Sequence, residues 1–339
     1  MSMNWSPILA GLAALSANAA NYELKATPQT VAVGYYWSEA KPVLKIQSGD
    51  SVKIQTAGGG GARAVAMGVP ADKVPPEFEA INKEVKDRGP GGHVLTGPIY
   101  IDNAEPGDVL EVRIQKIDLG VPYAMNAFRP TAGFLEEDFP YSRSKLIRLD
   151  GERMIGNFGS GIEIPLKPFF GSMGVAPPPQ AGRISSAPPW IHAGNIDNKE
   201  FVAGSTLYIP VHVKGALFEV GDGHAGQGDG EVDIQAMETS LVGTFQFIVR
   251  KDMHLTWPRG ETATHYIVMG MDEELVVATK IAVREMIDFL VKEKGLNKDD
   301  AYMLTSVAAD FHITQLVDGK KGVHGMISKS IFPAARPGK

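Results

Sequence analysis

The stretch Gly204-Ser205-Thr206-Leu207-Tyr208-Ile209 indicates the fold class, because a glycine and a small polar residue lead directly into alternating strand-forming residues. The same arrangement occurs at Gly49-Asp50 before residues 51–54 and at Gly107-Asp108 before residues 109–112. Each stretch predicts a turn that feeds a β-strand. The three lie at unequal separations, which excludes the fixed period of a solenoid or propeller.

Short apolar runs separated by glycine and proline continue from Pro42 to about Val249, a pattern typical of antiparallel β structure. We therefore expect an antiparallel β-sandwich or barrel-like body. The chain is predicted to divide into a possible signal peptide or N-terminal apolar segment (1–20), an N-terminal β-rich domain (21–170), a β-rich segment carrying the polar motif (171–270) and a C-terminal helical segment with its tail (271–339).

After Gly270 the apolar residues follow a helical period. The stripe consists of Leu275, Ala278, Ala282, Met286 and Phe289. It predicts a helix between Asp272 as the N-cap and Gly295 as the C-terminal stop, and Asn297 is the candidate N-cap of a second helix that runs to about Ala309. The fold class is therefore predicted to be α+β, predominantly β, with a C-terminal helical pair.

Composition excludes several classes of function. The chain has 339 residues, of which 44% are hydrophobic, and 33 Lys and Arg against 39 Asp and Glu give a net charge of -6. This balance offers no basic surface for nucleic acid or an anionic membrane, so neither is an expected partner. Cysteine is absent, which removes disulfides, thiolate metal ligands and cysteine nucleophiles. A homo-oligomer is expected from the general frequency of such assemblies.

The first residues resemble an export signal. Residues 8–15 are apolar and precede Ala17-Asn18-Ala19, which fits a signal-peptidase site, although residues 1–7 contain no Lys or Arg. The apolar run is too short to span a bilayer. We expect a periplasmic or secreted protein; the alternative is a cytoplasmic protein in which this segment packs on the body as a small helix.

Two polar stretches concentrate groups that carry chemistry, residues 192–198 and residues 221–231. Residues 206–220 between them are predicted to form a strand, a turn at Gly215 and a second strand. Such a hairpin would bring the two polar stretches to the same end of the body.

The second stretch contains three carboxylates and one imidazole, interleaved with glycines that let the backbone fold tightly around a small ion. They are Asp222, His224, Asp229 and Glu231. Mixed oxygen and nitrogen ligands suit Zn²⁺ or a similar divalent ion, whereas an all-oxygen subset suits Ca²⁺. The alternative interpretation is that these carboxylates only cap turns.

Other active-site classes lack their local context. Gly221, Gly223 and Gly226 match the spacing of a dinucleotide-binding fingerprint, but the glycine-rich sequence that follows is hostile to the helix that the fingerprint requires. The chain has no Gly-x-Ser-x-Gly elbow for a serine nucleophile. The nucleophile that these exclusions leave is water activated by a metal or by a carboxylate.

Longer motifs occur from about Gly34 to Phe332. They are 95–100 (LTGPIY), 105–108 (EPGD), 171–177 (GSMGVAP), 192–198 (HAGNIDN), 204–208 (GSTLY), 220–231, 264–266 (THY), 301–304 (AYML) and 321–324 (KGVH). Through these motifs the chain resembles the acetamidase/formamidase family. The resemblance implies a β-rich fold, a divalent metal near the polar motif, and hydrolysis of a small formamide- or acetamide-type linear amide to ammonia and a carboxylate. It would be a hydrolase of carbon–nitrogen bonds other than peptide bonds.

On this basis the metal is expected to be held by some of five residues, with Zn²⁺ favoured over Ca²⁺. They are His192, Asp197, Asp222, His224 and Glu231. Glu231 or Asp229 is predicted to pass a proton to the leaving nitrogen, Asn195 to orient the substrate or oxyanion, and His93 to line the same pocket. The alternative function is a catalytically inactive Ca²⁺-binding protein of the same fold that recognises a ligand.

Overall fold

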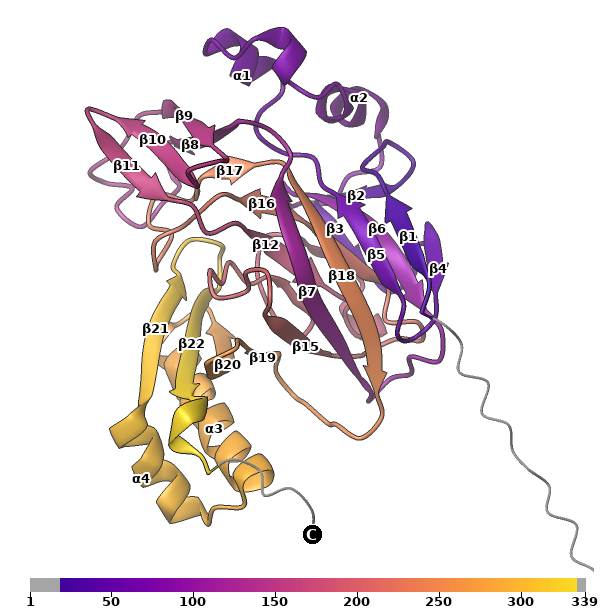
Figure 1. Cartoon of the computed structure of the whole chain (residues 1–339), viewed down its shortest axis with the longest axis vertical. Helices are drawn as coiled ribbons and strands as arrows, with labels where there is room; N and C mark the ends of the chain where they lie inside the picture. The colour runs from indigo at the N-terminus through magenta and orange to yellow at the C-terminus, as the bar shows by residue number, and fades with distance from the viewer. Residues whose placement is uncertain (1–18, 334–339) are drawn as a thin grey trace, which may run out of the picture.

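The computed structural model describes residues 19–333 and contains two large β-sheets with helices at both ends of the molecule (Figure 1). The predicted export signal at residues 1–18 lies outside the described residues. The first sheet has nine strands in the order β1 (Asn21–Leu24), β5 (Ser51–Gln55), β18 (Leu241–Arg250), β7 (Val109–Leu119), β15 (Thr206–Pro210), β19 (Arg259–Glu261), β20 (His265–Asp272), β22 (Lys321–Ser328) and β21 (Ala309–Gln315).

The second sheet has eleven strands. Its main path is β11 (Ile162–Pro165), β10 (Ile155–Gly159), β9 (Arg143–Asp150), β8 (Tyr123–Phe128), β17 (Glu238–Thr239), β16 (Phe218–His224), β12 (Phe169–Gly174) and β14 (Ala193–Asn195). Off this path, β6 (Val94–Ile101) pairs with β16, and β2 (Val31–Val33) and β4 (Leu44–Ile46) pair with β6. A separate pair joins β13 (Arg183–Ser185) to β3 (Tyr35–Trp37). Neither large sheet closes on itself, so the body is a sandwich and no barrel forms.

Aromatic side chains from the two large sheets meet in the core between them. Phe245 on β18 contacts Phe170 on β12 and Phe218 on β16, and Phe247 on β18 contacts Phe218, with ring centroids 5.0 to 6.2 Å apart. All four side chains are fully buried. Burial of each contributes about 1.5–3 kcal/mol, so this contact is a main source of stability and confirms the predicted sandwich.

The predicted hairpin at residues 206–220 is wrong. β15 pairs with β7 and β19 in the first sheet, whereas β16 pairs with β12, β17 and β6 in the second. Gly215, at φ +78°, lies in the connection that crosses between the sheets. Alternating sequence does not specify which sheet a strand joins, because both sheets bury one face in the same core. Segments 21–170 and 171–270 likewise contribute strands to both sheets.

The predicted C-terminal helices are confirmed as α3 (Leu275–Lys294) and α4 (Lys298–Ala308). Gly295 ends α3 in the left-handed conformation at φ +71°, and Asn297 Oδ1 caps α4 by accepting a hydrogen bond from Asp300 N at 2.9 Å. Asp272, the predicted N-cap of α3, instead ends β20, and Glu274 occupies the cap position.

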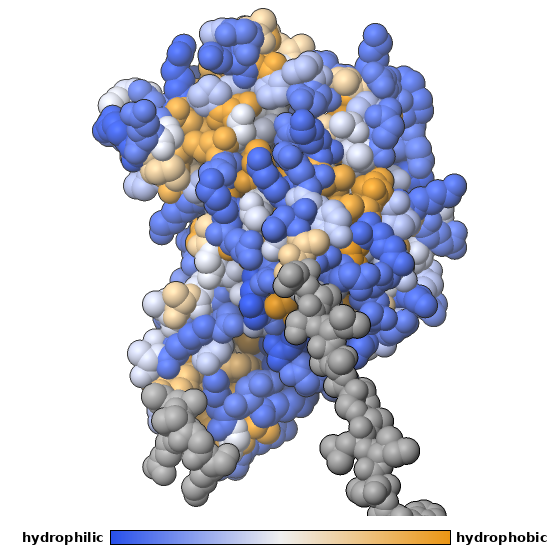
Figure 2. All heavy atoms as spheres, turned by 45° about the vertical axis from the view of Figure 1, so that its right-hand side comes forward, coloured by the Kyte–Doolittle hydropathy of each residue, from blue (hydrophilic) through white to orange (hydrophobic). Residues whose placement is uncertain are grey.

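Smaller helices lie at the other end of the body, where α1 (Ala62–Ala66) and α2 (Glu77–Glu84) form the excursion before β6 (Figure 1). Three short 3-10 helices occupy Ala71–Lys73, Pro179–Ala181 and Lys329–Ile331. Among the described residues, the helices are all too short or too polar to cross a membrane. Hydrophilic residues cover most of the face in Figure 2, and apolar residues form separate patches.

Gly270 allows α3 to pack directly on β20. A Cβ atom at this position would lie 2.3 Å from Ala278 O and 2.5 Å from Ala282 N in the helix. Any side chain must therefore push the helix away from the sheet.

We predict that Gly270→Val lowers the free energy of unfolding by about 1–3 kcal/mol or more, because backbone atoms of α3 cannot yield as a flexible side chain would. Urea unfolding followed by circular dichroism measures the change. Gly228→Ala is the matched control, since no atom lies within 4 Å of its added Cβ and its φ is ordinary. Equal stability of Gly270→Val and the control would contradict the close packing.

Candidate functional site

The two polar stretches meet because β12 lies between β14 and β16. Across these strands Ser172 on β12 pairs with Asn195 on one side and with Gly221 on the other. Asn195 and Asp197 therefore reach the same region as Asp222 and the residues that follow it. The sequence predicted this meeting, but adjacency in one sheet produces it in place of a hairpin.

Gly171 on β12 makes the space in which the polar side chains converge. A Cβ at this position would lie 2.4 Å from Asp197 Oδ1, 2.4 Å from Asp222 Oδ2 and 2.8 Å from His224 Cε1. Two carboxylates and an imidazole thus occupy the volume that a side chain would fill.

Gln227 fixes which nitrogen of His224 faces this space. The Gln227 amide nitrogen donates to Asp197 O at 2.8 Å, so its Oε1 accepts from His224 Nδ1 at 3.0 Å. His224 Nε2 is then left to face the carboxylates of Asp222 and Glu238, each at 3.3 Å. An imidazole held in one tautomer through its other nitrogen is the usual arrangement of a metal-binding histidine.

Two overlapping groups of side chains are close enough to hold a cation. Asp197, His224 and Glu231 each offer a ligand atom within 4.8 Å of the others, and so do Asp222, His224 and Glu238. Among the described residues, Asp197 Oδ1 and Glu231 Oε2 are buried without a hydrogen-bond partner, and the buried His224 Nε2 lies near two carboxylates but forms no hydrogen bond of good geometry with them. Buried polar atoms that lack partners are costly, and a divalent cation would satisfy all three. The donor set therefore fits a metal with mixed oxygen and nitrogen ligands.

The pKa values of these groups report the same convergence of negative charge. Burial raises the pKa of Asp197 and of Glu231 well above the ordinary range, and neighbouring carboxylates raise both further. Burial opposes protonation of His224, but Glu238 and Asp222 outweigh it and raise the pKa of the imidazole. In this arrangement protons occupy the site in the absence of a cation, so metal binding would displace them.

Three of the acidic residues have a left-handed backbone conformation that L-residues rarely adopt. The φ angles are +45° at Asp197, +56° at Asp222 and +43° at Glu231. Such conformations cost of order 1–3 kcal/mol each and persist only where the surroundings impose them. Three such conformations occur among the converging residues. We infer that this unfavourable backbone energy is retained because it orients the carboxylates toward one another.

A cavity of about 360 Å³ opens beside the converging groups. Asn195, Asp222, Glu231, Glu238 and His93 all line it, which places His93 where the sequence predicted. Asn195 Nδ2 donates to Asp197 Oδ2 at 2.6 Å, which leaves its oxygen without a partner among the described residues.

The tip between β21 and β22 supplies a further acid to this cavity. Asp318 lines the wall, and burial raises its pKa to about 6. The tip is fastened to the polar motif by hydrogen bonds from Gly230 N to Thr314 O and from Leu316 N to Gly230 O. Figure 1 shows the β21–β22 tip reaching back toward the body. The C-terminal part of the chain therefore completes the cavity.

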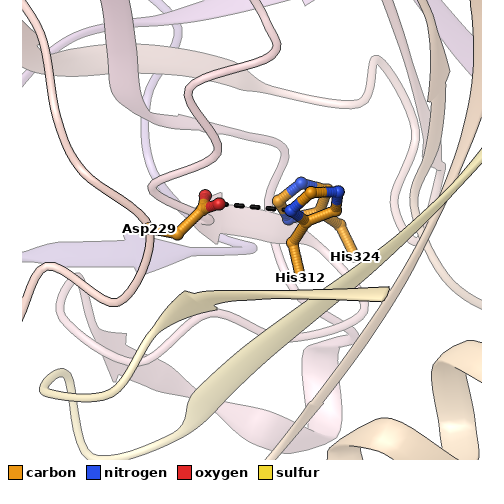
Figure 3. Close-up of side chains that lie close together, drawn as sticks. All are labelled: Asp229, His312 and His324. Atoms are coloured by element: carbon orange, nitrogen blue, oxygen red, sulfur yellow. Dashed lines mark hydrogen bonds and ion pairs between the residues drawn. The ribbon is translucent and has the colours of Figure 1, made fainter. Parts of the chain in front are cut away.

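Asp229 belongs to a different cluster, in which its carboxylate faces His312 next to His324 (Figure 3). Its carboxylate pairs with Lys199 Nζ at 3.0 Å and with His312 Nδ1 at 3.2 Å, and the His312 ring stacks on His324 with centroids 4.9 Å apart. Asp229 does not line the cavity. The predicted proton transfer therefore has no geometric support at Asp229, although sequence proximity made it equivalent to Glu231.

His192 is outside all three groups of described residues that could hold a cation, namely the two overlapping groups at His224 and the separate group Asp229, His312 and His324. Its side chain is fully buried with its ring edge-on to Tyr36, at a centroid distance of 4.9 Å, and both ring nitrogens lack a partner among the described residues. Burial lowers its pKa to about 3. Of the five predicted ligands, the structure brings together the other four.

Sequence reasoning missed Glu238, Asp318 and the role of Gln227. Glu238 stands directly opposite His224 in the β16–β17 pair. Asp318 is 87 residues beyond Glu231 along the chain, and neither acid lies in a dense polar motif. Gln227 lies inside the quoted motif, and its spacing of three residues from His224 was the available signal.

Comparison with known proteins shows similarity along nearly the whole described chain. The model of the Acetamidase/Formamidase family matches residues 29–182 and 181–333. A formamidase from Methylophilus methylotrophus is 28% identical over 300 residues, covering 67% of this chain and 73% of that protein. An acetamidase from Mycolicibacterium smegmatis is 25% identical over 233 residues, covering 51% of this chain and 55% of that protein. The chain thus spans about half the length of that acetamidase.

Solved structures share the fold. The structure of an acetamidase from Yersinia enterocolitica matches with a TM-score of 0.79 and 29% sequence identity, over 93% of this chain and 94% of that one. The sandwich and its C-terminal helices are therefore a shared architecture.

We predict that Gly171→Ala weakens Zn²⁺ binding at least about tenfold, because the methyl group would displace the carboxylates of Asp197 and Asp222. Isothermal titration calorimetry of Zn²⁺ measures the loss, and circular dichroism verifies that the variant is folded. Gly228→Ala, in the same polar motif but in open space, should bind as the wild type does. Unchanged affinity of Gly171→Ala would show that the metal does not bind at this convergence.

A second prediction concerns His192. The unfolded chain protonates this residue near pH 6.5, whereas the folded protein does so near pH 3, so the unfolded state binds the extra proton between these values. Acidification should therefore reduce stability more steeply in the wild type than in His192→Leu, by about 1.4 kcal/mol per pH unit. Urea unfolding at several pH values between about 6 and about 4 tests this. Parallel pH profiles would show that His192 is protonated in the folded state.

Proposed function

Because the chain belongs to the acetamidase/formamidase family, we propose that it hydrolyses the carbon–nitrogen bond of a linear amide to ammonia and a carboxylate, at the cavity beside His224. The amidase names of its relatives support hydrolysis of amides as the general activity. The proposed class is a hydrolase acting on carbon–nitrogen bonds other than peptide bonds, with substrates of the formamide or acetamide type.

The observation that carries the proposal is the set of unpartnered ligand atoms on the cavity side of β12 and β16. Asp197, His224 and Glu231 would hold a divalent metal, and Asp222 and Glu238 are close enough to His224 to share in the site. The imidazole favours Zn²⁺ over Ca²⁺. A metal bound here supplies Lewis-acid polarisation of the amide carbonyl and a lower pKa for bound water.

The chain's own residues perform the remaining tasks. Gln227 holds His224 in the tautomer that presents Nε2 to the cation, through the 3.0 Å bond to Nδ1. Asn195 has a free amide oxygen at the cavity wall and can position the amide group of a substrate. The nitrogen of an amide must be protonated before it leaves. Asp222, Glu238 and Asp318 line the wall outside the Asp197–His224–Glu231 set, and we assign this proton transfer to Glu238 or Asp318.

Ammonia release provides the test. Purified protein should release ammonia from formamide, acetamide or propionamide, lose the activity on chelation and regain it when Zn²⁺ is returned. Activity that persists after complete metal removal would contradict the metal site. Absence of ammonia with any metal would favour a ligand-binding protein of the same fold.

We predict that Glu231→Gln lowers kcat/KM for these amides by about 100-fold or more, since it removes a carboxylate that faces the reacting region. Glu219→Gln is the matched control: Glu219 is also buried, at 1% exposure, and lies on β16 outside the cavity wall. It should retain activity. Full turnover by Glu231→Gln would contradict the proposed role of Glu231 as a metal ligand.

A further inference from the structure

The cavity is larger than formamide or acetamide requires. Water occupies about 30 Å³ in the liquid, so an amide of three or four non-hydrogen atoms takes roughly 100 Å³. The cavity holds about 360 Å³, which is within the range of sites for larger ligands. Most of the space therefore lies beyond the amide group.

Two arginines line this additional space. Arg63 on α1 and Arg129 immediately after β8 both border the cavity. Both side chains are exposed, and among the described residues neither guanidinium has a carboxylate within 4 Å. Five other described arginines form such ion pairs, and four others, like these two, do not. Two cations without a counter-ion on one cavity wall suit an anionic group on the ligand.

The strand order separates the arginines from the acidic end of the cavity. His224 on β16 is opposite Glu238 on β17, Glu238 is opposite Met125 on β8, and the next strand is β9. Arg63 Nη2 donates to Ser144 Oγ on β9. Three strand spacings of about 4.8 Å place roughly 14 Å between the two ends. An anion at the arginines would thus be clear of the carboxylates around His224.

Much of the remaining wall is apolar or has no side chain, and Gln235 and Thr239 are the polar residues beside it. Phe78, Met125 and Ile234 face the cavity, as does the glycine run Gly58–Gly60. At Gly60 a Cβ would lie 2.5 Å from Met125 Sδ, so a side chain there would collide with this wall. A methylene chain suits such a surface, because it needs no hydrogen-bond partner.

We infer that the substrate is the monoamide of a linear dicarboxylic acid, with its amide at the His224 end and its free carboxylate on Arg63 and Arg129. The inference rests on the proposed amide hydrolysis and names its substrate class. Water supplies the oxygen of the new carbon–oxygen bond, the carbon–nitrogen bond breaks, and the nitrogen leaves with the water protons as ammonium. The products are a dicarboxylate and ammonium.

The experiment compares amides of equal length that differ only at the far end. The anionic series is malonamate, succinamate, glutaramate and adipamate; in each neutral partner a methyl ketone replaces the carboxylate. With the Zn²⁺-loaded protein, kcat/KM for the best anionic substrate should exceed that of its neutral partner by about 10-fold or more. Equal values for all pairs would overturn the inference.

Arginine variants test whether Arg63 and Arg129 cause the preference for the anionic substrate. Arg129→Gln and Arg63→Gln should lower kcat/KM for the anionic substrate by about 10-fold or more and leave the neutral partner nearly unchanged. Arg148→Gln is the matched control, because Arg148 is exposed on β9 and does not line the cavity. A similar loss on both substrates would show that the arginines serve structure, which also overturns the inference.

Two readouts separate failure of this inference from failure of the proposed function. If neutral amides are hydrolysed with no preference for the anionic series, amide hydrolysis stands and the substrate class is wrong. If none of the amides releases ammonia, the proposed function fails; calorimetric binding of glutarate that Arg129→Gln weakens would then still support anion recognition at the arginines, and its absence would overturn it.

Discussion

The pairing of β12 between β14 and β16 is the constraint on which the site depends. It places Asn195 and Gly221 in one row across Ser172, although they are far apart in the sequence. Gly171 in the same strand leaves space above it for Asp197 and Asp222. The fully buried Phe170 and Phe218 anchor β12 and β16 to the opposite sheet, so core packing holds the site in register.

The convergence of carboxylates is unfavourable by itself and must be maintained by the rest of the fold. Asp197, Asp222 and Glu231 combine positive φ angles with burial among like charges. Preorganisation of this kind trades stability for function, because the groups are already aimed before any ligand arrives. The aromatic core and the packing of α3 on β20 supply the stability that offsets this cost.

Local patterns in the sequence predicted what is local in the structure. Gly295 and Asn297 mark helix ends through backbone conformation and side-chain capping, so their neighbours in sequence were enough. The partner strands of β15 and β16 depend on pairing across the whole body, which alternation does not encode. For the same reason the dense motif around His224 was visible, whereas Glu238 and Asp318 join it only through tertiary structure.

The position of Asp318 in the chain determines when this wall of the cavity can form. Asp318 lies in the last strand connection, and its tip is hydrogen-bonded to Gly230 in the polar motif. A nascent chain therefore assembles this wall only after the β21–β22 connection has been synthesised. Contacts between such distant residues form late and slowly, since loop closure must precede them. The acidic groups thus come together only when strands from distant parts of the chain have paired.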